Sequence, residues 1–105
     1  IFIIDTSLFI SLLKIIDNPR QDIPLVATLR SPIVGLNEVD LTYIRLADRQ
    51  GDFYEAMMAY VEQQFEDSRN KSLQKKLKVF VDQLDSWREY ARRYSVVDLL
   101  RMLVE

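Results

Sequence analysis

The sequence holds few residues that could do catalytic chemistry, because it contains no histidine and no cysteine. Histidine is the commonest general base and metal ligand, and a cysteine thiolate serves as a nucleophile or a soft ligand. The chain also lacks a GxxxxGK[ST] phosphate-binding loop and an HExxH pair. We therefore expect no catalytic centre, cofactor or metal in this segment.

Two carboxylates, Asp17 and Asp22, flank a turn and could in principle share a metal ion or a proton. The residue types around them predict a simpler role. Asp17 lies at the turn that Pro19 helps to form, and Asp22 precedes an apolar stretch as a helix N-cap would. We favour this structural interpretation.

Basic residues gather in one part of the chain. Residues 69–93 hold eight basic and three acidic side chains, whereas residues 1–68 hold five and eleven. Lys71, Lys75 and Lys78 share one side of an expected helix and could lie along a DNA duplex, neutralising phosphates. The alternative is a solvated face balanced by acids, and the sequence leaves both open. The other basic residues are Arg69, Lys76, Arg88, Arg92 and Arg93, and the acids are Asp82, Asp85 and Glu89.

Length and composition favour a single folded domain. A chain of 105 residues can bury roughly two-thirds of its unfolded surface. Its hydrophobic content is 49%, and two glycines and three prolines are too few for a turn-rich β-sandwich. The net charge of −2 gives no global attraction to nucleic acid, and no apolar run approaches the ~20 residues of a membrane span.

Apolar spacing predicts an all-α fold, a compact orthogonal array of about six helices with one long helix near residues 72–93. That helix carries an apolar seam, a row of apolar residues spaced alternately four and three positions apart. Residues 66–72 are the expected loop before it. Residues 1–4 fit either a β-like lead-in or a frayed turn. The other expected helices cover about 6–16, 23–30, 38–49, 53–65 and 96–105. The seam consists of Leu73, Leu77, Phe80, Leu84, Trp87 and Ala91.

Helix boundaries follow from prolines, glycines and capping residues. Proline disfavours helix in the residue before it, so Pro19 and Pro32 mark the ends of the first two helices. Asn37 and Asp52 are expected N-caps. Gly51 is expected to stop the third helix. Gly35 supplies backbone freedom before the Asn37 cap.

The run LLKIIDNPRQDIPLVATLRSPIVGL resembles the start of the 2B subdomain of UvrD/Rep-type DNA helicases of superfamily 1. Three segments are most similar to one branch of this family, the A subunit of bacterial AddAB (RexAB) helicase–nucleases. They are IDNPRQDIPL, LRSPIVGL and IRLAD. The similarity is strong over residues 11–60, including FYEAMMAY, and weaker through LDSWREYARRYSVVDLLRML. Together with the start at Ile1, it suggests a piece of a longer polypeptide.

The resemblance implies a role as an accessory 2B-like subdomain, residues 1–105, of an ATP-dependent DNA helicase and exonuclease in double-strand break repair and recombination. It implies ATP and Mg²⁺ as cofactors of the parent enzyme, whose motifs are not in these residues. It further implies contacts with duplex DNA, with the other domains and with the partner nuclease subunit. The implied location is cytoplasmic and nucleoid-associated in bacteria.

The resemblance also points to the loop at residues 31–37 as a phosphate site. Its backbone N–H groups and the next helix N-terminus could hold a DNA phosphate. Glu38 and Asp40 place negative charge there, so the residues favour a tight connection whose Ile33 and Val34 enter the core. The candidate DNA-binding residues are therefore Gly35, Leu36 and Asn37 in the loop, and Lys71, Lys75 and Lys78 in the long helix.

A second interpretation is a free-standing helical module that binds protein and has no DNA role. Tyr54 and Met58 fall off the apolar stripe of their helix and are candidates for such a surface. An apolar face left uncovered could also make the isolated chain self-associate. An independent enzyme is disfavoured, because its usual residues are missing.

Overall fold

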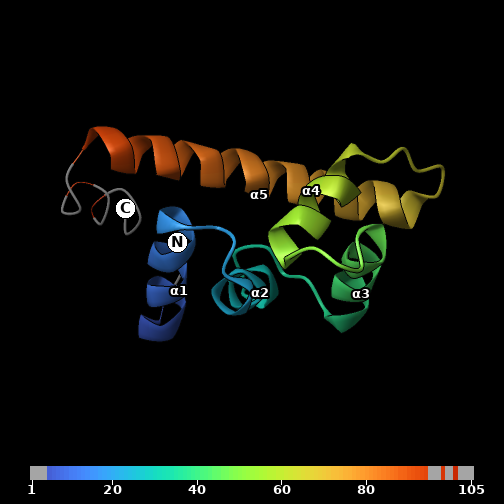
Figure 1. Cartoon of the computed structure of the whole chain (residues 1–105), viewed down its shortest axis with the longest axis horizontal. Coiled ribbons are helices and arrows are strands. Elements are labelled where there is room, and N and C mark those ends of the chain that lie inside the picture. The colour runs from blue at the N-terminus through green and yellow to red at the C-terminus, as the bar shows by residue number, and fades with distance from the viewer. Residues whose placement is uncertain (1–4, 95–97, 99–100, 102–105) are drawn as a thin grey trace.

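The computed structural model describes residues 5–94 together with 98 and 101, and this part of the chain forms five helices and no strand (Figure 1). The expected all-α fold is confirmed, with five helices where about six were expected. The sixth expected helix falls largely outside the described residues, as do residues 1–4. The helices are α1 (Thr6–Asp17), α2 (Asp22–Arg30), α3 (Glu38–Ala47), α4 (Phe53–Glu62) and α5 (Ser68–Arg93).

Helix α5 lies across the four shorter helices, which line up along one side of it (Figure 1). Its 26 residues correspond to about 39 Å of helix, close to the longest dimension of 42 Å. Helix α1 contacts α5 towards one end, and α4 contacts it nearer the other. The predicted seam is confirmed: four of its residues are buried, and Trp87 and Ala91 are half-buried against the core. The buried four are Leu73, Leu77, Phe80 and Leu84.

Helix α5 begins at Ser68, four residues earlier than predicted, and α4 ends at Glu62, before the expected residue 65. The connection therefore covers residues 63–67, shorter and earlier than the expected loop at residues 66–72. Asp67 is the N-cap, and its carboxylate accepts the backbone N–H of Asn70 at 2.9 Å. The first turn is polar because its side chains face solvent, which hid it from a search for apolar periodicity. A capping residue therefore marked the true start.

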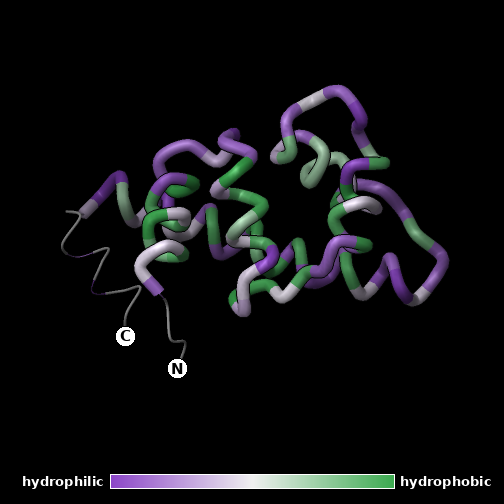
Figure 2. The backbone as a smooth tube through the Cα atoms, turned by 90° about the horizontal axis from the view of Figure 1, so that it is seen from below, coloured by the Kyte–Doolittle hydropathy of each residue, from purple (hydrophilic) through white to green (hydrophobic). Residues whose placement is uncertain are grey.

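The short helices pack in pairs, α1 with α2 and α3 with α4, and α2 joins the pairs by contacting α4. Helix α1 starts after the N-cap Asp5 and ends at Asp17, as predicted within a residue. The Arg88 guanidinium of α5 donates to the Ile16 carbonyl at 3.0 Å, which satisfies one of the free carbonyls at the end of α1. Figure 2 shows apolar and polar positions alternating around these helices.

Helix α3 starts with the predicted capping box. The Asn37 side chain accepts the Asp40 N–H, and the Asp40 carboxylate accepts the Asn37 N–H. The helix ends at Ala47, earlier than the expected Arg49, because Asp48 folds the chain back by accepting the N–H groups that follow. Gly51 does not use a left-handed conformation there. A side chain at Gly51 would place Cβ 2.5 Å from the Asp48 carboxylate.

Helix α4 begins after the predicted N-cap Asp52, which accepts the Glu55 N–H at 2.8 Å. Its carboxyl end is closed by a residue of α5. The Gln74 amide donates to the carbonyls of Tyr60, Val61 and Gln63, at the end of α4 and just after it. The Tyr60 carbonyl also accepts the N–H of the C-cap residue Gln63. None of the described helices combines the length and the hydropathy that a membrane span requires.

Candidate nucleic-acid interface

The three lysines proposed to contact DNA lie in the first half of α5 and are exposed. Their spacing of four and three residues puts Lys71, Lys75 and Lys78 on one face, over about 10 Å of helix axis. Within the described residues, no ion pair engages any of them. Residues 68–78 contain five basic side chains and no acidic one, so the charge is concentrated in the first half of α5.

The arginines of the same basic region are engaged within the fold. Arg69 pairs with Asp40 at 3.4 Å and lies over the Tyr43 ring, 5.0 Å from its centroid. Arg92 and Arg93 both pair with Glu89, at 2.9 and 2.7 Å. Among the described residues of this region, the lysines of α5, Lys76 included, are therefore the cations that remain available to a ligand.

The loop of residues 31–37 uses most of its backbone donors internally. The N–H groups of Gly35 and Leu36 donate to carbonyls at the end of α2, those of Ser31 at 2.7 Å and Leu29 at 2.9 Å. The Asn37 N–H donates to the Asp40 carboxylate at 3.0 Å. A phosphate bound here would have to displace these bonds and approach an acidic side chain.

The loop otherwise forms the tight connection that was expected, with a flexible glycine and with apolar side chains directed to the core. Gly35 has φ 76°, in the left-handed region that glycine adopts most readily. Ile33 and Val34 are half-buried and pack against the core, and Leu36 is buried. Ile33, Val34, Lys75 and Lys76 also line one groove, so the fold brings the loop beside the lysines of α5. Whether these residues bind DNA stays a prediction.

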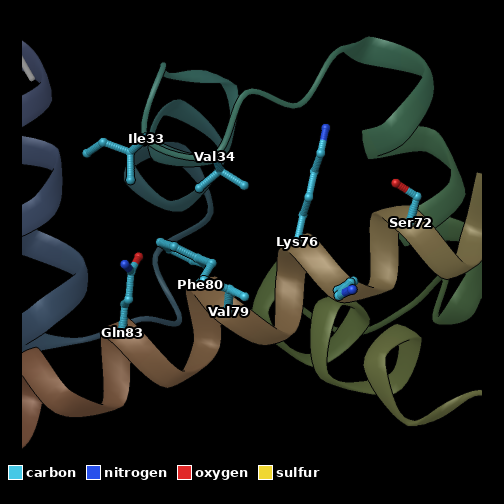
Figure 3. A pocket seen from close by; sticks show the side chains of 8 residues that line it. Ile33, Val34, Ser72, Lys76, Val79, Phe80 and Gln83 are labelled. Atoms are coloured by element: carbon cyan, nitrogen blue, oxygen red, sulfur yellow. The ribbon is translucent and has the colours of Figure 1, made fainter.

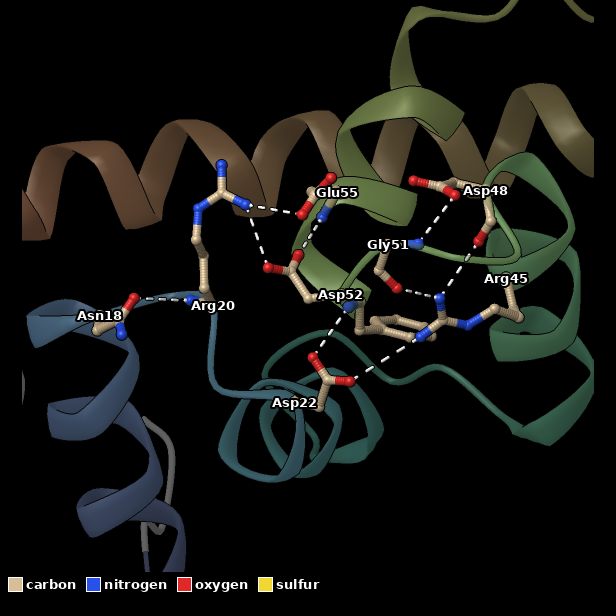
Figure 4. Close-up of polar contacts among 9 residues, drawn as sticks. Asn18, Arg20, Asp22, Arg45, Asp48, Gly51, Asp52 and Glu55 are labelled. Carbon is tan, nitrogen blue, oxygen red and sulfur yellow. Dashed lines mark hydrogen bonds and ion pairs between the residues drawn. The ribbon is translucent and has the colours of Figure 1, made fainter.

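Asp22 does not cap its own helix, which corrects the sequence interpretation. Helix α2 starts at Asp22 itself, after Gln21, and no side chain caps it. The Asp22 carboxylate instead accepts the Phe53 N–H at 2.9 Å and lies 3.9 Å from the Arg45 guanidinium (Figure 4). Asp22 thus closes the amino end of α4, a helix 31 residues away in sequence.

A second polar contact joins the same elements. The Arg20 guanidinium reaches both Asp52 and Glu55 at 3.1 Å (Figure 4). It also lies over the Tyr54 ring, 5.3 Å from the ring centroid. Its hydrogen bond to Asp52 raises the pKa of Arg20. Burial alone would raise the pKa of the Asp52 carboxyl, but the Glu55 N–H and the Arg20 guanidinium outweigh it and hold that pKa below its usual range.

These carboxylates serve as structural acceptors. Arg45 also donates to the carbonyls of Asp48 and Gly51, at 3.2 and 2.7 Å, and so holds the α3–α4 connection beside Asp22. Within the described part of the chain, no group of three or more carboxylates is close enough to hold a metal ion. The contacts of Asp22 and Arg45 hold the backbone at the start of α4 and in the α3–α4 connection.

The surface expected around Tyr54 and Met58 is not an exposed patch. Both side chains are half-buried against the core, and Arg20 covers the Tyr54 ring. Helix α3 carries exposed apolar residues instead. They are Val39 at 51% exposure, Tyr43 at 38% and Leu46 at 52%. Their spacing of four and three residues, which places them on one side of α3, was the overlooked signal.

Comparisons with known proteins identify relatives over nearly the whole chain. The A subunit of the ATP-dependent helicase/nuclease of Geobacillus kaustophilus is 46% identical over 99 residues, which are 94% of this chain. The protein of the same name from Anoxybacillus flavithermus is 48% identical over 99 residues, again 94% of this chain. That of Bacillus licheniformis is 49% identical over 96 residues, or 91% of this chain.

This chain belongs to the family of ATP-dependent helicase/nuclease A subunits. The resemblance to the A subunits of helicase–nucleases that was seen in the sequence is thereby confirmed. The chain spans about 8% of the length of these relatives, so it corresponds to a small part of each. No protein-family profile matches it.

Proposed function

We propose that this chain is a 2B-like accessory subdomain of the A subunit of a helicase/nuclease, and that the lysine face of α5 contacts duplex DNA. The observation that carries the DNA contact is the set of three exposed lysines on one side of a long helix, none of them paired with a described acid. A duplex presents one phosphate charge per about 1.7 Å of its axis, so ammonium groups spread over about 10 Å meet several phosphates.

Two features of α5 support a contact with the phosphate backbone over a base-reading role. The lysine face carries no aromatic side chain between its cations, so it offers no stacking platform for single-stranded bases. Lysine ammonium groups are compact charges that satisfy phosphate oxygens without demanding a base sequence. The proposed contact is therefore sequence-independent and salt-sensitive. Gly35, Leu36 and Asn37 stay a weaker prediction as a further phosphate contact.

The test is fluorescence anisotropy of a labelled duplex with a single-stranded tail, titrated with the 105-residue chain at several salt concentrations. Each phosphate neutralised contributes about 0.9 to the slope of log K against log salt. Replacing Lys71, Lys75 and Lys78 by Ala should lower that slope by up to about 3 and weaken binding. The slope reports the contacts directly, because a general loss of folded protein would not change it.

A matched control removes the same charge elsewhere. Lys14, Arg30 and Arg49 are exposed and distributed over α1, α2 and the α3–α4 connection. Their replacement by Ala changes the net charge of the chain equally but should leave most of the binding. If both triple variants lost the same DNA affinity, binding would depend on the overall charge of the chain and not on the lysine face of α5. No binding at the lowest salt would refute the DNA contact.

A protein-binding role is the second candidate, and the exposed apolar side of α3 favours it. We infer that Val39 and Leu46 meet another domain of the parent protein or the partner nuclease subunit in the assembled enzyme. Changing both to Ser should leave DNA binding by α5 intact and weaken assembly of the full-length protein with its partner. Loss of DNA binding in this variant would show that the two surfaces are not separate.

The remaining proposals concern the whole enzyme. Because the relatives are named as parts of an ATP-dependent helicase/nuclease, the parent protein would use ATP, with Mg²⁺, in unwinding and exonuclease action during DNA repair and recombination. The part represented by this chain would tune unwinding through its contacts. A cytoplasmic, nucleoid-associated location follows from that role.

A further inference from the structure

A groove of about 360 Å³ runs between the loop after α2 and the side of α5 (Figure 3). Its apolar lining comes from both elements: Ile33 and Val34 of the loop face Val79 and Phe80 of α5. The volume lies at the small end of ligand pockets, so it suits one or two side chains better than a large cofactor.

The apolar floor of the groove is incompletely covered. Val79 is 55% exposed, although it neighbours the fully packed Phe80, which is 1% exposed. Ile33 and Val34 are only half-buried on the opposite wall. An apolar side chain seated between Val34 and Val79 would remove this surface from water, which is the dominant favourable term in protein association.

The rim of the groove is positively charged, and none of the described lining residues is acidic. Lys75 and Lys76 line it, and Ser72 and Gln83 are its polar ends. Lys76 extends from α5 on the same side as Val34 of the loop (Figure 3). No described acid pairs with either lysine. The groove is thus complementary to a ligand that is apolar at its centre and negative at its edges.

We propose that this groove binds an acidic protein segment, which inserts one large apolar side chain between Val34 and Val79 and places carboxylates beside Lys75 and Lys76. Nucleic acid fits less well. Phosphates gain nothing from an aliphatic floor, and the one aromatic ring of the lining, that of Phe80, is too buried to stack on a base. The groove excludes Lys71 and Lys78 but shares Lys75 with the lysine face proposed to contact a duplex, so an acidic segment bound here would compete with DNA for that one lysine.

Methyl and amide NMR of the isotopically labelled 105-residue chain tests this proposal. The probe is a capped hexapeptide, DELFEE, and its control is KKLFKK, which keeps the apolar centre and reverses the charge. The acidic peptide should shift the methyl signals of Ile33, Val34 and Val79 in a saturable manner. The basic peptide should not.

Variants on one helix separate the groove from general charge. Lys76→Glu lies in the lining, whereas Lys78→Glu makes the same charge change outside it. At low ionic strength the first should weaken peptide binding about fivefold, the size expected for exposed ion pairs, and the second should leave it nearly unchanged. Val79→Asp should abolish the methyl shifts, and its amide spectrum reports that the fold is retained.

Three results would overturn the proposal. One is the absence of peptide-induced shifts at the groove methyls. Another is equal weakening by the charge changes at positions 76 and 78. The third is saturable shifts of Ile33, Val34 and Val79 caused by a DNA duplex at the expense of the acidic peptide, because the groove would then be a nucleic-acid site.

Discussion

The replacement Asp22→Ala tests whether the link between the start of α2 and the start of α4 stabilises the fold. Asp22 makes three favourable interactions. Its carboxylate accepts the Phe53 N–H at 2.9 Å, faces Arg45 at 3.9 Å, and lies in the first turn of α2, where negative charge is favoured. The substitution removes all three and leaves the Phe53 N–H to water.

The expected loss of stability is about 1–2 kcal/mol. A hydrogen bond to a charged acceptor contributes about 1.5–3 kcal/mol, and the lower part of that range applies because the Asp22 side chain is 49% exposed. The ion pair with Arg45 is partly exposed and long, so it adds at most a few tenths of a kcal/mol. For a domain of this size the loss corresponds to roughly 5–12 °C in Tm.

The assay is urea unfolding, monitored by circular dichroism. The dependence of the free energy of unfolding on urea concentration (the m value) must be equal in the variants, so that their midpoints can be compared. Asp17→Ala is the matched control: it removes the same group at the carboxyl end of α1, where no hydrogen bond or ion pair with a described residue holds it. The control should be neutral or slightly stabilising, because a negative charge at a helix carboxyl end is unfavourable. If Asp22→Ala costs no more than Asp17→Ala, the link does not stabilise the fold and the argument fails.

Three further perturbations test other details of the fold. Gly35→Ala should cost about 1 kcal/mol in urea unfolding, because φ 76° strains a side chain although the space around Gly35 is open. Gln74→Ala should cost about 1 kcal/mol in the same assay, and its hydrogen-exchange protection should fall selectively at the end of α4, where three carbonyls lose a donor. Burial raises the pKa of Tyr60 to about 12, so the folded chain holds that proton more tightly than the unfolded chain. The resulting stability is fully present below about pH 10 and is lost as the pH rises towards 12, and a tyrosinate absorbance titration should show a step near pH 12 that is missing in Tyr60→Phe.

Local signals in the sequence predicted most of the elements. The capping box at Asn37, the N-cap Asp52 and the left-handed Gly35 depend on interactions within three or four residues, which a sequence displays directly. The buried stripes of α4 and α5 followed from helical periodicity for the same reason. The errors in helix bounds fell where polar residues replaced the apolar signal, at Ser68, after Ala47 and after Glu62. The predicted cap at Asp22 was wrong for another reason, because its carboxylate bonds to a distant helix.

The candidate site was predicted only in part. Spacing alone placed Lys71, Lys75 and Lys78 on one side of a helix, because a helix has a fixed period. It could not show that Arg69 is engaged by Asp40 while no described acid pairs with these lysines, since that depends on α3 lying beside α5. The groove was likewise hidden, because its walls come from two separate segments, one before α3 and one within α5.

The sequence by itself therefore determined the helical class, the caps at Asn37 and Asp52, the buried stripes and membership of the family of helicase/nuclease A subunits. These properties are encoded in local spacing or in the identity of aligned residues. The tertiary structure alone decided that Asp22 closes the amino end of α4, that α3 exposes Val39 and Leu46, and that Val79 faces a loop across a groove. The physical reason is that local sequence sets the conformation an aspartate or a valine prefers but not the residue it contacts. Which distant residue becomes its partner depends on how the helices pack against one another.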